Sequence, residues 1–191
     1  MTETILKMQK KVKRYLDKDR YDHTIGVMHT AGCLAMRYGA DLEKALIAGL
    51  LHDCAKCVPS AEKIKLCERN HIEISEAEYQ NPGLLHAKLG AFFARKKYGI
   101  EDEEILRSIE SHTTGRPKMS LLDKIIYIAD YMEPGRDVAP NLPEVRALAF
   151  VDLDACLYRI LEDTLAYLEK KGATVDPATC LLYTSDAADE A

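Results

Sequence analysis

Apolar side chains recur every three or four positions along most of this chain, which is the period of an α-helix. One such stripe runs from Ile5 to Leu16, and a second runs from Ile25 to Met36 and stops at Gly39. Glycine is typical of the position just after a helix, because it adopts the left-handed conformation without strain. No alternating run of useful length indicates a strand, so the pattern predicts an all-α fold.

The remaining helices are predicted from the same period and from their end signals. Asp41 is expected to cap the helix that leads to His52 and Asp53, and Ser60 is expected to cap a helix over residues 61–70. Further helices are predicted over residues 84–98, 102–111, 121–132 and 153–171. We expect the prolines to lie between these helices, namely Pro59, Pro82, Pro117, Pro134, Pro140 and Pro143.

Length and composition favour one domain. The chain has 191 residues and is 47% hydrophobic, enough for a sizeable core. We expect a single domain over residues 1–180. Residues 181–191 are small, acidic and without apolar period, and they look like translated sequencing-adaptor sequence. This tail is expected to be disordered or non-native, and no function is assigned to it.

The charge limits the partners. A net charge of -5 and a pI near 5.7 argue against binding long nucleic acid. The sequence contains no run of 18 apolar residues and no apolar signal core at its N-terminus, so a cytoplasmic protein without a membrane partner is expected. The sequence does not decide whether the protein is a homodimer, because sequence alone does not show an exposed apolar helix face.

Six cysteines are scattered through predicted helices, which favours free thiols over a disulfide framework. Cys54 and Cys57 form a C-x-x-C pair, for which a redox or zinc role is the alternative. A zinc site of this kind would need a second pair, and the sequence has none. We therefore expect both cysteines to be inert.

Histidines and aspartates near helix ends are the candidates for chemistry. His52 and Asp53 follow the apolar run 45–51, and an adjacent imidazole and carboxylate can converge on one cation. For any single histidine a hydrogen-bonded core role is the more common one. Asp130 differs, because it lies in the apolar run 125–132 and is costly to bury unless it is metal-bound or paired with a lysine or arginine.

Five motifs carry a resemblance to a known family. They are Arg20 to Val27 (RYDHTIGV), Leu51 to Lys56 (LHDCAK), Asn81 to His86 (NPGLLH), Ser111 to Gly115 (SHTTG) and Ile128 to Arg136 (IADYMEPGR). In this order they resemble the bacterial YqeK family of HD-domain phosphohydrolases, over about residues 5–179. Members are symmetrical diadenosine tetraphosphate hydrolases that form two ADP from this small dinucleotide. The resemblance implies an HD-type helical fold. The helical periods predict about five core helices of this type and extra helices at both ends.

The resemblance also implies the site residues. His23, His52, Asp53 and Asp130 match the metal ligands, for which iron is usual, although imidazole and carboxylate also suit Mn, Co or Zn. Positions around the bound nucleotide are matched by Arg20, Lys56, Cys57, Val58, Pro59, His86, His112, Thr113 and Arg136. A C-terminal segment, expected to contact the nucleoside, comprises Gly172, Ala173, Thr174, Val175, Asp176 and Pro177. Asp176 departs from the family, which usually has an aromatic residue or histidine there.

A mechanism follows from the charges of these groups. A bound cation would activate a water and polarise a phosphoryl oxygen. Asp53, Lys56, His86 and His112 are the expected catalytic residues, with Lys56, Arg136 and, if protonated, the two histidines offsetting charge on the phosphate oxygens. The alternative for Lys56 and Arg136 is that they are solvated surface charges without a role in the site. The alternative for His86 and His112 is that they hold a second metal.

Two alternatives to this function stay open. One is another HD-type enzyme, such as a nucleoside monophosphate phosphatase or a cyclic nucleotide phosphodiesterase. The other is a nucleotide-binding module without catalysis, against which the complete set of metal-ligand positions argues.

Overall fold

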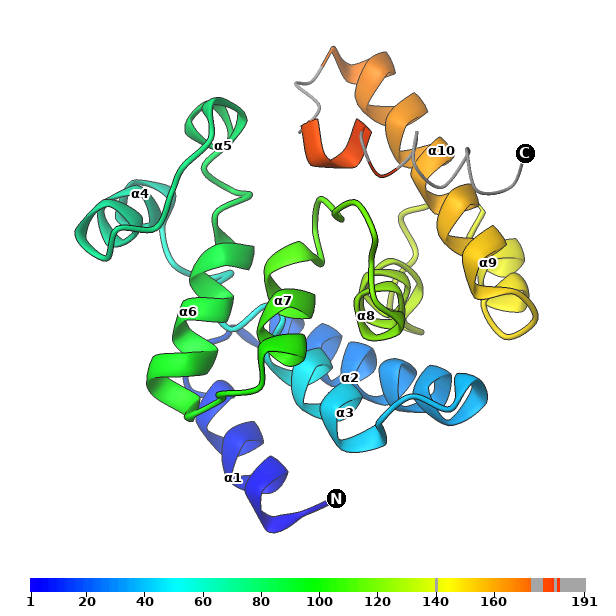
Figure 1. Cartoon of the computed structure of the whole chain (residues 1–191), viewed down its shortest axis with the longest axis horizontal. Coiled ribbons are helices and arrows are strands. Elements are labelled where there is room, and N and C mark those ends of the chain that lie inside the picture. Colours follow the sequence, from blue (N-terminus) through cyan, green and yellow to red (C-terminus); the bar gives the residue numbers. More distant parts are fainter. Residues whose placement is uncertain (140, 173–176, 181, 183–191) are drawn as a thin grey trace.

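A computed structural model describes residues 1–139, 141–172, 177–180 and 182. This part of the chain forms ten numbered helices and contains no strand (Figure 1). The all-α prediction is therefore confirmed. In chain order the helices are α1 (Glu3–Val12), α2 (Lys18–Tyr38), α3 (Leu42–Leu51), α4 (Ser60–Arg69), α5 (Glu76–Gln80), α6 (His86–Tyr98), α7 (Glu103–Ser111), α8 (Leu121–Met132), α9 (Leu142–Leu148) and α10 (Leu153–Lys171).

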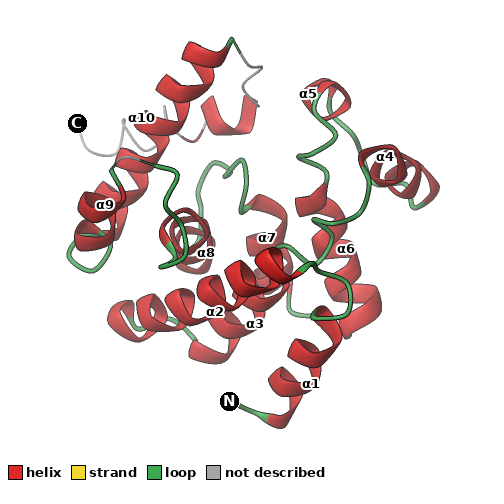
Figure 2. Ribbon diagram, turned by 180° about the vertical axis from the view of Figure 1, so that it is seen from behind, coloured by secondary structure: helices red, strands yellow, loops and turns green. Residues whose placement is uncertain are grey.

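Five helices form the centre of the molecule. Helix α2 packs against α3 and α8, α3 also contacts α7 and α8, and α6 packs on α7. The interior of this group is aliphatic, with Met28, Leu50, Ile109 and Ile125 fully buried. Helices α4 and α5 lie on one side of it and α9 and α10 on the other, as both views show (Figures 1 and 2). Helix α1 before this group in the chain and α9 and α10 after it are the additions expected at both ends, whereas α4 and α5 are inserted between α3 and α6.

The caps that the sequence predicts at the second and third helices are present. Asp41 accepts a hydrogen bond from the backbone N–H of Lys44 at the start of α3. Gly39 ends α2 in the left-handed conformation, with φ 73°. These two residues fix the tight connection between α2 and α3, the pair that carries much of the site.

Two predicted helix starts are wrong. Ser60 is the first residue of α4 and not its cap; the carbonyl of Pro59 accepts the first helical bonds, from Glu62 and Lys63, and no side chain caps this end. Helix α6 begins at His86 and not at residue 84. The backbone N–H groups from Leu84 to Ala87 bond three residues back, which is the tighter spacing of a turn.

Two short helices, α5 and α9, were not predicted from the apolar period. Neither is long enough to show two full repeats of it. Pro143 was expected between helices, but it lies in the first turn of α9. A proline is tolerated there because the N–H groups of a first turn have no intrahelical partner.

The chain returns to the centre after α10. The Thr179 hydroxyl donates to the carbonyl of Thr114 at 2.8 Å, and Leu182 is fully buried against Gly115. Gly115 has φ 68°, and a Cβ atom there would collide with the Leu182 side chain. Leu182 thus packs into the core, although it belongs to the tail that was expected to be disordered or non-native. The rest of that tail, residue 181 and residues 183–191, lies outside the described residues.

The described helices include none that is long and apolar enough to cross a membrane. Cys33, Cys54, Cys57, Cys67 and Cys156 are free thiols, as predicted. Burial raises the pKa of the Cys54 thiol to about 12, and this thiol donates to the carbonyl of Gly90. A thiol with such a pKa stays protonated near neutral pH, so the structure favours an inert Cys54.

Candidate metal and phosphate site

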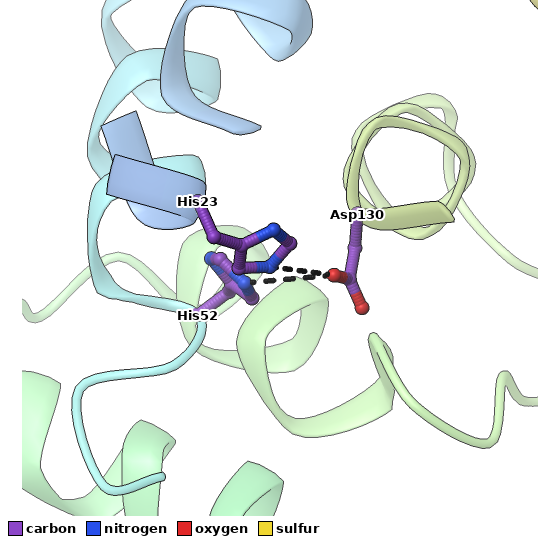
Figure 3. A group of neighbouring side chains, drawn as sticks. All are labelled: His23, His52 and Asp130. Carbon is purple, nitrogen blue, oxygen red and sulfur yellow. Dashed lines mark ion pairs between the residues drawn. The ribbon is translucent and has the colours of Figure 1, made fainter. Parts of the chain in front are cut away.

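Three helices bring the predicted metal ligands together. His23 lies on α2, His52 and Asp53 immediately follow α3, and Asp130 lies on α8. Figure 3 shows His23 and His52 pointing toward the Asp130 carboxylate. The Nε2 atom of His23 lies 3.0 Å from Asp130 Oδ1, and that of His52 lies 3.8 Å from the same oxygen. Asp53 Oδ2 lies 3.5 Å from His52 Nε2 and 3.8 Å from His23 Nε2.

These four side chains fit a metal ion. A transition metal bonded to nitrogen or oxygen at roughly 2.1 Å holds adjacent ligand atoms roughly 3 Å apart, close to the spacing observed. Two buried ligand atoms of this group, His23 Nε2 and His52 Nε2, have no hydrogen-bond partner, and neither has Asp53 Oδ1, which faces His86 and Lys56. Buried polar atoms are normally satisfied, so this group of orphans points to an absent ligand. Two imidazoles with carboxylates suit a transition metal better than calcium or magnesium.

Backbone carbonyls set the tautomers of three histidines. The Nδ1 atoms of His52, His86 and His112 lie 2.7, 2.6 and 2.7 Å from the carbonyl oxygens of Gly49, Gly83 and Ile109. A carbonyl only accepts, so each Nδ1 carries a hydrogen and each neutral ring presents the Nε2 lone pair. In every case the carbonyl belongs to the residue three positions earlier, at a helix end or a turn, so all three rings use the same nitrogen, Nε2, to face the site.

Both aspartates are held ionised. Burial by itself would raise the pKa of Asp53, but in the metal-free site positive charge on His52, together with hydrogen bonds from His112 and His52, outweighs it and keeps that pKa well below its usual range. Burial would likewise raise the pKa of Asp130. The contact with His23 is the largest of the effects that lower this pKa, and the net pKa lies below its usual range. The two carboxylates are therefore available as anionic ligands at neutral pH.

A second cluster adjoins the first through Asp53. His86 Nε2 lies 3.2 Å from Asp53 Oδ1, and Lys56 Nζ lies 3.7 Å from the same oxygen. The Thr113 hydroxyl lies 3.1 Å from the Nε2 atoms of both His86 and His112. Burial is the largest factor that lowers the pKa of His86, to about 4, so this ring is neutral at pH 7 and adds no positive charge.

Two arginines flank the cluster. Arg20 Nη1 lies 2.8 Å from Asp53 Oδ2, and Arg136 Nη2 lies 2.8 Å from Asp130 Oδ1. The pairing of Asp130 with Arg136 is the salt bridge that the sequence left open, although the two histidines share the same carboxylate. Both guanidinium groups are partly exposed, with 29% and 35% of the side chain accessible, so each can also reach a ligand.

A cavity of about 540 Å³ opens beside Asp130, His112 and Arg136. Three tyrosines line it, and its other wall residues are small or apolar with a few polar groups. Cavities with apolar walls and few polar groups are typical small-ligand sites. The wall includes Tyr127, Tyr131, Tyr167, Val138, Ala139, Asn141, Asp163 and Thr164.

Not all of the predicted site residues meet here. Cys57 and Val58 line a separate cavity of about 490 Å³ between α4 and α6, and Pro59 is the N-cap residue of α4. Gly172 ends α10, and Pro177 opens the short helical segment that returns to Thr114. The predicted contacts at Ala173, Thr174, Val175 and Asp176 lie outside the described residues.

The sequence reasoning missed several residues at the site. Glu133 belongs to a quoted motif but was given no role, and its carboxylate lies 3.1 Å from His23 Nδ1. Tyr131 and Tyr167 lie in helical apolar patterns, where an aromatic residue is expected in the core. Nothing in the sequence distinguishes these wall residues from ordinary packing.

An all-α fold with a His, His-Asp and Asp cluster defines a metal-binding HD domain, and the comparisons agree. The model of the HD domain family matches residues 20–135, the span from α2 to α8. The chain is 45% identical to the "Bis(5'-nucleosyl)-tetraphosphatase, symmetrical" of Bacillus subtilis, over 90% of this chain and 91% of the relative. It is 36% identical to the Staphylococcus aureus protein of that name, over 94% and 93% of the two chains.

A solved structure extends the similarity. A "predicted HD superfamily hydrolase involved in NAD metabolism" from Clostridium acetobutylicum superposes with a TM-score of 0.92 at 42% identity, over 96% of both chains. The chain therefore belongs to the HD domain family, in the branch of the symmetrical bis(5'-nucleosyl)-tetraphosphatases. The resemblance seen in the motifs is confirmed.

Proposed function

We propose that this protein is a metal-dependent hydrolase that cleaves diadenosine tetraphosphate symmetrically into two ADP. The observation that carries the proposal is the cluster of His23, His52, Asp53 and Asp130 beside a tyrosine-lined cavity. Relatives that align over nine tenths of the chain bear the name of this activity.

The cavity beside Asp130 supports binding of one adenosine. Nucleobases stack well on tyrosine rings, and the polar groups of Asn141 and Thr164 offer hydrogen-bond partners. With one ADP half held there, the central phosphoanhydride would lie over the ligand cluster. An asymmetric cut would require the substrate to shift along the site by one phosphate.

The charge of the site supports a polyphosphate. Asp53, Asp130 and the buried Glu133 are offset by Arg20, Lys56 and Arg136 within the same cluster. A divalent cation would therefore give the site a net positive charge, which favours an anionic substrate. Arg20 and Arg136 contact different aspartates and can bind phosphates on both sides of the scissile bond.

The chain's own groups would do the following during hydrolysis. A divalent cation, when bound, supplies an activated water and polarises a phosphoryl oxygen. Arg20, Lys56 and Arg136 stabilise charge that develops on the phosphate oxygens. The Thr113 hydroxyl and the neutral His86 ring, which contact each other, orient the water or a phosphate oxygen.

We further propose that iron is the native metal. The resemblance to the YqeK family carries this choice, and a site with two imidazoles and carboxylates supports iron as well as Mn, Co or Zn. Metal analysis of the protein purified without added metal, and then reloaded with each ion, tests it. Full activity with zinc alone and no iron in the native protein would refute the choice.

Product analysis tests the activity itself. Purified protein loaded with Fe, Mn, Co or Zn is incubated with diadenosine tetraphosphate, and ADP, ATP, AMP, adenosine and phosphate are separated by chromatography. Two ADP per substrate is the expected result. ATP plus AMP as the main products, or no turnover with any of the four metals, would overturn the proposal. A faster release of phosphate from nucleoside monophosphates, or opening of cyclic nucleotides, would favour another HD-type enzyme.

A further inference from the structure

His23 differs from the other histidines of the site in what holds its ring. The Nδ1 atoms of His52, His86 and His112 donate to backbone carbonyls, whereas Nδ1 of His23 lies 3.1 Å from Glu133 Oε1. Glu133 is buried, with 4% of its side chain accessible. Its other oxygen, Oε2, accepts the backbone N–H of Gly135 at 2.6 Å.

We propose that Glu133 is a positioning residue that holds His23 in the orientation and tautomer required to bind the metal. The Glu133 carboxylate accepts from Nδ1 of His23, so Nδ1 carries the hydrogen and Nε2 stays available to bind a metal ion beside Asp130. A carboxylate behind a ligating histidine also makes the imidazole a stronger donor than a carbonyl does. This inference rests on the metal site of the proposed function.

Two features of the fold keep Glu133 in place. Gly26, one turn after His23 on α2, lies so close that a Cβ atom there would collide with the Glu133 carboxylate. Arg146, on α9, donates three hydrogen bonds of 2.8 to 2.9 Å to the carbonyls of Met132, Glu133 and Arg136. The turn that follows α8 is thus tied down from two sides.

The same turn serves both metal-ligand helices. It carries Glu133, which contacts His23 on α2, and Arg136, which contacts Asp130 on α8. Its geometry therefore couples two ligands that are far apart in sequence. A role confined to stability would need only the Gly135 contact and would not require a carboxylate oxygen on the His23 ring.

Metal affinity provides a readout that a purely structural role would not change. Metal-depleted full-length protein is titrated with Co²⁺ in competition with a chelator. In Glu133→Gln the amide has one acceptor for two N–H donors, so we expect Co²⁺ to bind about 10- to 100-fold more weakly. The control is Glu78→Gln, which alters another buried carboxylate that accepts N–H donors, from Ser75 and Lys88. Its Co²⁺ affinity should stay within about twofold of wild type.

A second pair of variants leaves every acidic residue and every ligand unchanged. Gly26→Ala should push the flexible carboxylate away from His23 and weaken Co²⁺ binding in the same direction. Gly32→Ala on the same helix meets the flexible side chains of Leu46, at 3.0 Å, and Leu42, at 3.5 Å, and should bind Co²⁺ normally. Because alanine favours a helix more than glycine does, neither change weakens α2 itself.

The outcomes separate this inference from the proposed function. Normal Co²⁺ affinity in both Glu133→Gln and Gly26→Ala would overturn the role of Glu133 and leave the metal site intact. Absence of Co²⁺ binding in the wild-type protein would overturn the metal site and the role of Glu133 together. Should Glu133→Gln fail to fold, Gly26→Ala alone decides. Nitrogen chemical shifts of the His23 ring in the metal-depleted protein give an independent check, and loss of the Nδ1–H tautomer in Glu133→Gln is expected.

Discussion

The Nε2 atoms of His86 and His112 lie 3.1 Å apart, although both rings carry their hydrogen on Nδ1. Two lone pairs at this distance repel each other unless a donor or a cation intervenes. Lys56 Nζ and the Thr113 hydroxyl each lie 3.1 Å from His86 Nε2 and can donate to it. The structure thus has protein donors at the point where a second metal ion would otherwise be needed.

We therefore predict that His86 and His112 serve the phosphate and not a second metal. The variants His86→Gln and His112→Gln should retain one equivalent of metal per chain, while kcat/KM for diadenosine tetraphosphate falls roughly 100-fold. Elemental analysis of the loaded proteins, together with steady-state kinetics, checks both parts. Two equivalents in the wild-type protein and one in His112→Gln would instead establish a second metal ion.

Removal of a metal ligand should abolish metal binding and activity together. Asp53→Ala and His52→Ala each remove a ligand atom that faces the cluster. A residue that only orients a ligand costs 10- to 100-fold in metal affinity, so loss of a direct ligand should cost at least about 100-fold. Elemental analysis after gel filtration measures the bound metal. Full occupancy in both variants would contradict the ligand assignment.

The tyrosine-lined cavity predicts an effect on substrate binding. Tyr167 is 60% exposed, so Tyr167→Ala should change the free energy of unfolding little. Loss of a stacked base should raise KM for diadenosine tetraphosphate roughly 5- to 100-fold with a smaller change in kcat. Tyr79→Ala removes another exposed tyrosine, on α5, and serves as the control. An equal KM in both variants would exclude Tyr167 from the nucleoside site.

The depressed pKa of His86 predicts how stability depends on pH in the metal-free protein. Its pKa falls from 6.5 to about 4, mainly because the ring is buried, so the unfolded chain binds the proton more readily between these values. The free energy of unfolding should therefore decrease as pH falls from about 6.5 to 4, by about 3 kcal/mol at most from this residue. The lowered pKa values of Asp53 and Asp130 act below this window, since unfolded aspartates titrate near 3.8.

Urea unfolding at several pH values measures this dependence. The slope of the free energy of unfolding against pH should be smaller in metal-depleted His86→Gln than in metal-depleted wild-type protein. His29→Gln is the control, because His29 is exposed and lies outside the cluster. Equal slopes in the wild-type protein and His86→Gln would show that His86 does not carry this pH dependence.

Much of the fold was readable because local rules decide it. Long amphipathic segments, aspartate caps such as Asp41 and terminal glycines such as Gly39 and Gly99 gave most of the long helices. The short helices α5 and α9 were not readable, because they are too short to show a period and depend on packing. The start of α4 differs from the prediction because Ser60 has the chemistry of a cap, whereas Pro59 occupies the N-cap position and no side chain caps this end.

The sequence by itself determined the candidate metal ligands and their order, because the four residues of a shared motif are visible without coordinates. Only the tertiary structure decided what surrounds them. Glu133 reaches His23 across 110 positions, and Arg146 ties the turn beside it from a helix that the sequence did not reveal. Such contacts depend on how α2, α8 and α9 pack, and the periodic pattern that defines each helix does not encode which face of one helix meets which residue of another.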